Sequence, residues 1–134
     1  MIEHSKIADH GSRLVELAQA LVLANQKANP QLAVSIPDKV KKTAEPEIGQ
    51  VLVVFAAAAN DASPLRPLPV EGKYYDSDGH IVFLSGYFAE NGDLAEFEVA
   101  RLDLVPLQRI PDVAEIAFEP GQSGYYNTVK PQSG

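Results

Sequence analysis

Apolar residues recur at helical spacing near the start of the chain. Leu14, Leu17 and Leu21 lie three or four positions apart, and smaller apolar residues between them widen the same face. This spacing predicts an amphipathic helix with one face on a core. Ser12 is its predicted N-cap. Asn29-Pro30 is its predicted end, because proline cannot continue a helix and disfavours the helical region for the preceding residue.

The next forty residues carry weaker patterns. A second, shorter helix is predicted from Pro37 to Glu45-Pro46, with Asp38 in its first turn and a lysine triplet at the C-terminal end that the helix dipole favours. The apolar run Val51–Ala59 is ambiguous, since its β-branched first half favours a strand and its four alanines favour a helix. We predict a strand over residues 50–56.

The clearest pattern is a series of three strands, over residues 70–76, 80–89 and 94–104. Asp76-Ser77-Asp78-Gly79 and Glu90-Asn91-Gly92-Asp93 separate them as tight turns, and Asn-Gly is a strong hairpin signal. In the third strand, Phe97 shares one face with other apolar residues, and Glu96 and Glu98 share the other. This alternation predicts a sheet with one face in water.

These elements predict an α+β fold with an N-terminal helix or helices packed on an antiparallel β-meander. Val113 to Phe118 forms either an edge strand or a helical turn. Residues 121–134 are polar and rich in Gly and Ser apart from Tyr125-Tyr126. We therefore expect one domain over residues 1–120 and a polar C-terminal tail over residues 121–134.

Charge is unevenly divided along the chain, whose net charge is −7. Residues 1–45 hold six Lys or Arg against five acids, and residues 46–134 hold five against thirteen. The acidic part is a poor phosphate binder, so we expect no direct binding to nucleic acid or to an anionic membrane, and attraction to a basic partner. The chain has no cysteine, export-type leader or membrane-length apolar run, which predicts a cytoplasmic protein.

Candidate catalytic and metal sites fail on their spacing. A calcium loop with Gly79 in sixth place would need acids where Tyr74 and Ser85 stand. The three histidines have no zinc-site spacing, and neither a phosphate loop nor a nucleophile elbow is present. Glu96 and Glu98 are expected to face solvent, where a carboxylate is a poor general acid. The sequence therefore predicts a protein that is not an enzyme and takes no cofactor and no metal.

The block from Tyr87 to Pro111 reads YFAENGDLAEFEVARLDLVPLQRIP. It resembles the final hairpin of small bacterial immunity-type proteins, which look like products encoded beside antibacterial toxins. In these, an acidic Asn/Asp-Gly turn and an acid–apolar–acid strand lead to Asp-x-x-Pro and a closing proline. The resemblance implies an antitoxin-like role: binding and inhibiting a toxin. It assigns no functional residue.

Charge and resemblance together predict a protein–protein interaction with a basic toxin domain, because opposite charge speeds encounter and discourages wrong partners. The alternative is a structural or assembly subunit that forms a homo-oligomer through its sheet. The candidate partner-binding residues are the acids of the meander and three tyrosines as aromatic anchors: Asp76, Asp78, Glu90, Asp93, Glu96, Glu98, Asp103, Tyr74, Tyr75 and Tyr87. For each tyrosine, half-buried sheet packing is the competing interpretation.

Overall fold

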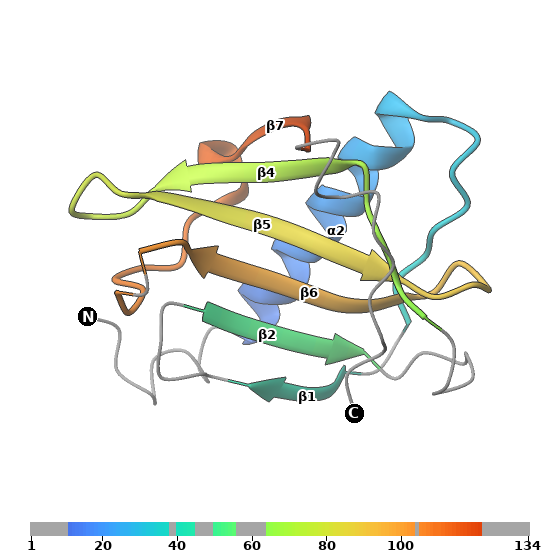
Figure 1. The fold of residues 1–134 in the computed structure, drawn as a ribbon, viewed down its shortest axis with the longest axis horizontal. Helices are drawn as coiled ribbons and strands as arrows, with labels where there is room; N and C mark the ends of the chain where they lie inside the picture. The colour runs from blue at the N-terminus through green and yellow to red at the C-terminus, as the bar shows by residue number, and fades with distance from the viewer. Residues whose placement is uncertain (1–10, 38–39, 45–49, 56–63, 104, 122–134) are drawn as a thin grey trace.

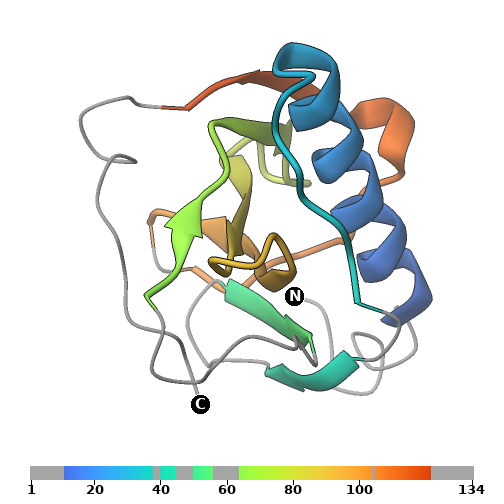
Figure 2. The same ribbon diagram turned by 90° about the vertical axis from the view of Figure 1, so that its right-hand side faces the viewer.

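The computed structural model describes residues 11–37, 40–44, 50–55, 64–103 and 105–121. One helix, α2 (Gly11–Ala28), lies across one face of an antiparallel sheet (Figures 1 and 2). The strands are β1 (Val40–Ala44), β2 (Gln50–Phe55), β3 (Arg66–Pro67), β4 (Val70–Tyr75), β5 (Ile81–Phe88), β6 (Leu94–Arg101) and β7 (Ala117–Pro120). A short 3-10 helix, η1 (Val113–Glu115), precedes β7. The predicted α+β class is confirmed.

The α2 helix forms where the apolar spacing predicts it. Leu14, Leu17 and Leu21 are fully buried against the sheet. The helix begins at Gly11, one residue before the predicted cap, and ends at Ala28, directly before Asn29-Pro30. Near its end, the buried Asn25 side chain donates to the Val70 carbonyl (3.0 Å) and accepts from the Val70 N–H (2.8 Å), which ties the helix to the first residue of β4.

The meander of β4, β5 and β6 is formed by consecutive antiparallel strands. Its two turns contain Gly79 and Gly92 at φ of 86° and 93°, the left-handed region that the turn prediction required. Gly92 also needs to lack a side chain, because a β-carbon there would lie 2.4 Å from the carbonyl oxygen of Ala33. The loop after α2 is thus held against the β5–β6 turn.

The sheet extends beyond the meander on both sides, in the order β1-β2-β6-β5-β4-β7. The strand predicted over residues 50–56 is confirmed as β2, while residues 56–59 of that run lie outside the described residues. Both alternatives predicted for Val113–Phe118 occur, one after the other. The helical turn η1 forms first, and β7, which pairs with β4, follows it. The tail predicted over residues 121–134 lies outside the described residues except for Gly121.

The helix predicted from Pro37 is wrong where the structure describes it. Residues 40–44 form the edge strand β1, which pairs antiparallel with β2. Val40 lies opposite Phe55 and Thr43 opposite Val53. Two β-branched residues therefore complete a ladder with a buried strand, and this pairing outweighs the helical preference of the lysines.

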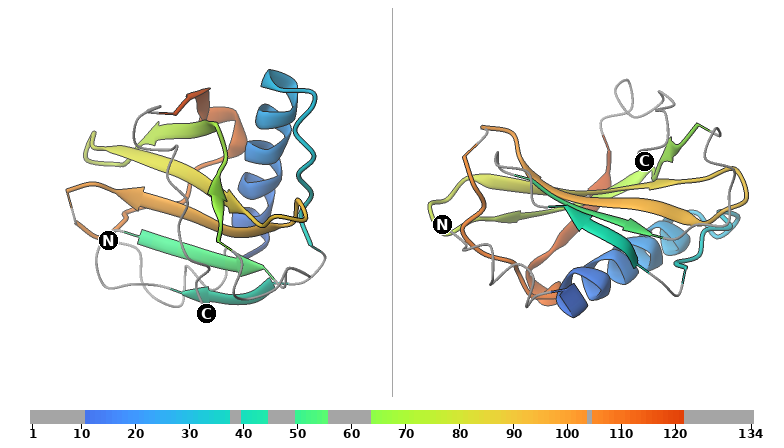
Figure 3. Two further views of the ribbon diagram at one scale, coloured as in Figure 1. Left: turned by 45° about the vertical axis from the view of Figure 1, so that its right-hand side comes forward. Right: turned by 90° about the horizontal axis from the view of Figure 1, so that it is seen from below.

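The sheet is curved, and α2 fills its inner side (Figure 3). The expectation that Glu96 and Glu98 face solvent is wrong. Glu96 is fully buried and Glu98 half-buried. The unforeseen neighbour is β2, which places Val54 opposite Glu96 and Leu52 opposite Glu98. Strands therefore flank β6 on both sides, and neither glutamate lacks an interaction partner.

Candidate functional site

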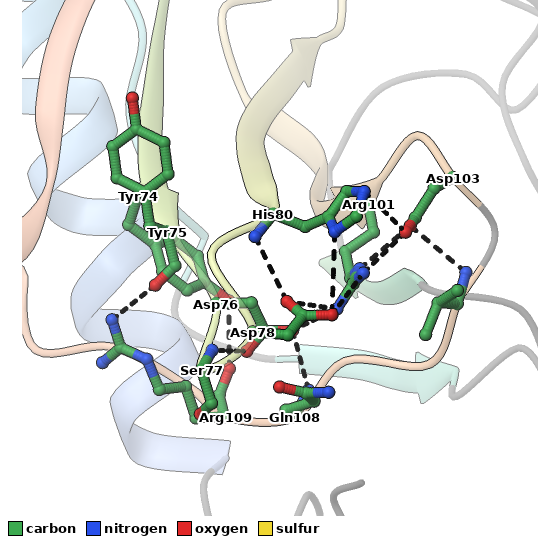
Figure 4. Close-up of polar contacts among 11 residues, drawn as sticks. Tyr74, Tyr75, Asp76, Ser77, Asp78, His80, Arg101, Asp103, Gln108 and Arg109 are labelled. Carbon is green, nitrogen blue, oxygen red and sulfur yellow. Dashed lines mark hydrogen bonds and ion pairs between the residues drawn. The ribbon is translucent and has the colours of Figure 1, made fainter.

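A cluster of charged side chains lies at the end of the sheet where β4 turns into β5 and β6 ends (Figure 4). We call this region the turn end and its central group the Arg101 cluster: Arg101, Asp76, Asp78, His80 and Asp103. Asp76 and Asp78 belong to the tight turn after β4, and His80 directly precedes β5. Arg101 is the last residue of β6. The cluster therefore joins all three strands of the meander.

Arg101 is buried because the β-strand period of two places it on the same face as Phe97 and Val99. Its side chain is 1% exposed. The guanidinium contacts three carboxylates: Nη1 lies 3.0 Å from Asp76 Oδ2, Nη2 lies 2.9 Å from Asp78 Oδ2, and Nε and Nη2 lie 2.9 and 2.6 Å from the two oxygens of Asp103. Each nitrogen of the buried, charged guanidinium is thus paired with a carboxylate.

Asp76 anchors the cluster to the backbone. Its side chain is 0% exposed. Besides the Arg101 contact, Oδ2 accepts a hydrogen bond from the Gln108 N–H (3.0 Å), and Oδ1 accepts one from the Ser77 N–H (3.0 Å). Asp76 therefore fixes the turn, the end of β6 and the loop after β6 relative to one another.

Asp78 and Asp103 present the outer side of the cluster. Their side chains are 34% and 25% exposed. The half-exposed His80 ring lies between them, with Nε2 3.2 Å from Asp103 Oδ2 and Nδ1 3.7 Å from Asp78 Oδ2. Hydrogen bonds from Arg101 hold the pKa of Asp103 at about 2 and lower the pKa of Asp78. Both carboxylates are therefore charged at neutral pH, and their positions are fixed.

Exposed apolar side chains also occur at the turn end, close to these carboxylates in the sequence. Tyr75 is 60% exposed at the end of β4, Leu102 is 72% exposed after β6, and Val105 follows in the same loop. The Val105 N–H donates to Asp103, which holds this loop against the cluster. The turn end thus combines partly exposed acids with apolar side chains on a fixed frame.

A second arginine fixes the adjoining side of the turn end. Arg109 donates to the Tyr75 carbonyl (2.6 Å) and to Glu115 Oε1 (2.6 Å). Its guanidinium also lies 5.4 Å from the centre of the Tyr74 ring, and the Tyr74 hydroxyl donates to the Arg109 carbonyl. These contacts connect the end of β4 to η1 and close the frame under the exposed Tyr75 ring.

The predicted partner-binding acids fall into three places. Asp76, Asp78 and Asp103 come together at the turn end. Glu90 and Asp93 lie at the β5–β6 turn, at the opposite end of the meander (Figure 1). Glu96 and Glu98 lie between these ends, on the face of the sheet opposite α2. The full burial of Asp76 and Glu96 takes their side chains out of reach of a rigidly docking partner.

The three candidate tyrosines also lie in different environments. Tyr74 lies in the core, where burial raises its pKa, so it is not an exposed anchor. Tyr87 is half-buried and packs beside Leu65 and Ala95. Only Tyr75 projects from the surface among these three. Binding by the exposed members of the set stays a prediction.

Arg101, Arg109 and Leu102 were missing from the sequence-based candidates. Arg101 could have been found, because it continues the core-facing positions of Phe97 and Val99 and a buried arginine requires acidic partners. Arg109 and Leu102 lie in an irregular loop, where no periodicity indicates which side chains are exposed.

Within the described part of the chain, no group of three or more His, Asp or Glu side chains could hold a metal ion. The same residues include no helix with the length and apolar character needed to cross a membrane. Comparisons with family models, with curated proteins and with solved structures find no match to this chain.

Proposed function

We propose that this protein is a non-enzymatic binding protein of the immunity type, which binds and inhibits a basic toxin domain in the cytoplasm. The turn end is the proposed docking surface. One observation carries the proposal: Arg101 holds Asp78 and Asp103 in fixed, partly exposed positions at the end of the sheet where Tyr75 and Leu102, close to them in the sequence, are also exposed.

The charge of the Arg101 cluster supports a basic partner. Three carboxylates surround one guanidinium, which leaves a net charge of −2 when His80 is neutral. Fixed charges of this kind steer encounter, and their positions cost no ordering when a partner binds. Lysine- and arginine-lined sites of enzymes that act on nucleic acids or nucleotides are the surfaces with matching charge.

The apolar residues supply the contact area that charges alone do not. Binding energy concentrates in a few aromatic and large apolar side chains near the centre of an interface, with polar groups at the rim. Tyr75 and Leu102 fit the first role, and Asp78 and Asp103 fit the second. The proposed interface is therefore an apolar centre with an acidic rim.

The alternative function is a structural or assembly subunit that forms a homo-oligomer through its sheet. The observation in its favour is that β1 ends the sheet order, and an edge strand offers unpaired backbone groups. Light scattering separates the two functions. A monomer at micromolar concentration contradicts assembly, and a stable oligomer without any partner favours it.

The test starts from the gene neighbouring the one that encodes this chain. We expect its product to contain a C-terminal domain that stops bacterial growth when expressed alone, with growth restored by co-expression of this protein. Leu102→Ser should weaken the purified complex by about tenfold, because it removes an exposed apolar contact. Asp78→Asn with Asp103→Asn should slow association and reduce its salt dependence.

The control is Glu90→Gln with Asp93→Asn at the opposite end of the meander. It removes the same formal charge and should leave affinity for the toxin domain unchanged. Equal affinity of the Leu102→Ser variant and the wild type, in a complex that does form, rejects the turn end as the interface. A neighbouring product with no growth-inhibiting domain contradicts the toxin-inhibiting function itself.

A further inference from the structure

One buried carboxylate, that of Glu71 in β4, has no ion pair with any residue that the structure describes. The residue is 5% exposed, and Oε2 has no hydrogen-bond partner within the described structure. Buried carboxylates are normally paired or fully hydrogen-bonded, because removing a charge from water is costly. An unpaired buried carboxylate therefore calls for an explanation.

The sheet register places Glu71 on the face opposite α2. A β-carbon on the next residue, Gly72, would contact Ile116 and Phe118, which pack on the core that α2 covers. Side chains alternate along a strand, so Glu71 and Lys73 point to the other face. This is the same face that holds Glu98, and it is separate from the turn end.

The register also gives Glu71 an acidic neighbour. Glu119 of β7 lies directly opposite it. Like charges directly opposite each other in a sheet are destabilising. On the other side, the β4–β5 pairing continues from Gly72 opposite Leu84 to place Ser85 beside Glu71. Two carboxylates and a hydroxyl therefore lie in one row on β7, β4 and β5, and Glu98 of β6, which lies opposite Ser85 and has a partner of its own, continues the row.

Lys73, which lies beside this row, is already engaged. Lys73 Nζ lies 2.8 Å from Glu119 Oε1, and this hydrogen bond raises the pKa of Lys73. Two carboxylates and one ammonium give these three residues a formal net charge of −1. Glu119 is 46% exposed, so the group is open to solvent at β7, while Glu71 Oε2 lies buried behind it in the row.

We infer that Glu71 and Glu119 form the binding site for one organic cation, a primary ammonium or a guanidinium group, on the sheet face opposite α2. A single positive charge neutralises the group and supplies the hydrogen-bond donor that Glu71 Oε2 lacks. An organic cation fits better than a metal ion, because the described residues include no set of three or more metal-ligating side chains. The cation is either a small free amine or a basic side chain of a partner protein.

The experiment uses the full chain and L-argininamide as the probe. Backbone amide resonances are followed during titration, against sodium chloride at matched ionic strength. We expect saturable shifts confined to residues around 71, 85 and 119, and at least tenfold weaker binding to the Glu71→Gln variant. Glu90→Gln, an exposed carboxylate-to-amide change in the β5–β6 turn, should bind the probe as the wild type does.

Absence of saturable shifts, or equal binding by wild type and the Glu71→Gln variant, overturns the inference. If Glu71→Gln does not fold, Glu119→Gln provides the same comparison at an exposed position. Repeating the titration on the complex with the toxin domain distinguishes the two possible sources of the cation. A blocked site indicates a side chain of the partner, and an open site indicates a free amine. Failure of probe binding leaves docking at the turn end untouched, because the two sites share no residue.

Discussion

Asp76 provides the sharpest test of how the Arg101 cluster is held together. Its side chain is fully buried and accepts hydrogen bonds from the Arg101 guanidinium, the Gln108 N–H and the Ser77 N–H. Asp76→Ala removes all three and leaves a buried guanidinium with fewer partners. Loss of one member of a buried pair costs about 3–5 kcal/mol, so we expect a loss in that range.

Asp76→Asn should cost less, and the difference follows from the geometry. The amide oxygen can take the place of Oδ2 and still accept from Arg101 and Gln108. The amide nitrogen then faces the Ser77 N–H, so one hydrogen bond to a charged group is lost. Such a bond contributes about 1.5–3 kcal/mol. We therefore predict that the asparagine variant lies between the wild type and the alanine variant in stability.

Urea unfolding followed by far-ultraviolet circular dichroism measures these differences. With a slope of about 1.5 kcal/mol per M, the alanine variant should lose about 2–3 M in its unfolding midpoint. Glu90→Gln, an exposed carboxylate change, is the control and should shift the midpoint little. An alanine variant within about 0.5 kcal/mol of the wild type would refute the reasoning, because Asp76 would then not be a buried partner of Arg101.

Three further predictions concern the frame of the fold. Asn25→Ala should cost about 2–3 kcal/mol, because two buried backbone groups of Val70 lose their partner, and amide hydrogen exchange at Val70 should accelerate. Gly86→Ala should cost about 1–3 kcal/mol in urea unfolding, since its β-carbon would lie 2.6 Å from a leucine methyl carbon; a neutral result contradicts the packing. Arg101 depresses the pKa of Asp103 from 3.8 to about 2, so this carboxylate stabilises the fold fully above about pH 4 and progressively less as the pH falls toward 2. Asp103→Asn should flatten the stability–pH curve in this window, and an unchanged curve would contradict the pairing.

The helix and the meander could be predicted because each is specified by residues close together in the sequence. The apolar spacing of α2, the proline after it and the glycines at the two turns act locally. The β1 strand could not be predicted in this way. Its lysines favour a helix, and it becomes a strand through its pairing with β2, which depends on tertiary contacts.

The candidate site was predictable only in part. The turn acids Asp76 and Asp78 stood out, but their arrangement around Arg101 depends on the register between β5 and β6. The burial of Glu96 was missed because the pairing of β6 with β2 is also a long-range contact. Alternation along β6 correctly identifies Phe97 as a core residue, yet it cannot show that β2 covers the neighbouring edge. Exposure of Leu102 follows from loop geometry, for which no sequence pattern exists.

Hydrogen–deuterium exchange on the complex with the toxin domain tests the docking surface most directly. We predict slower exchange on binding at residues 75–80 and 101–109, the two segments of the turn end, and no change at the β5–β6 turn around residues 90–93. Protection confined to the β5–β6 turn or to α2, with the turn end unchanged, would contradict this prediction.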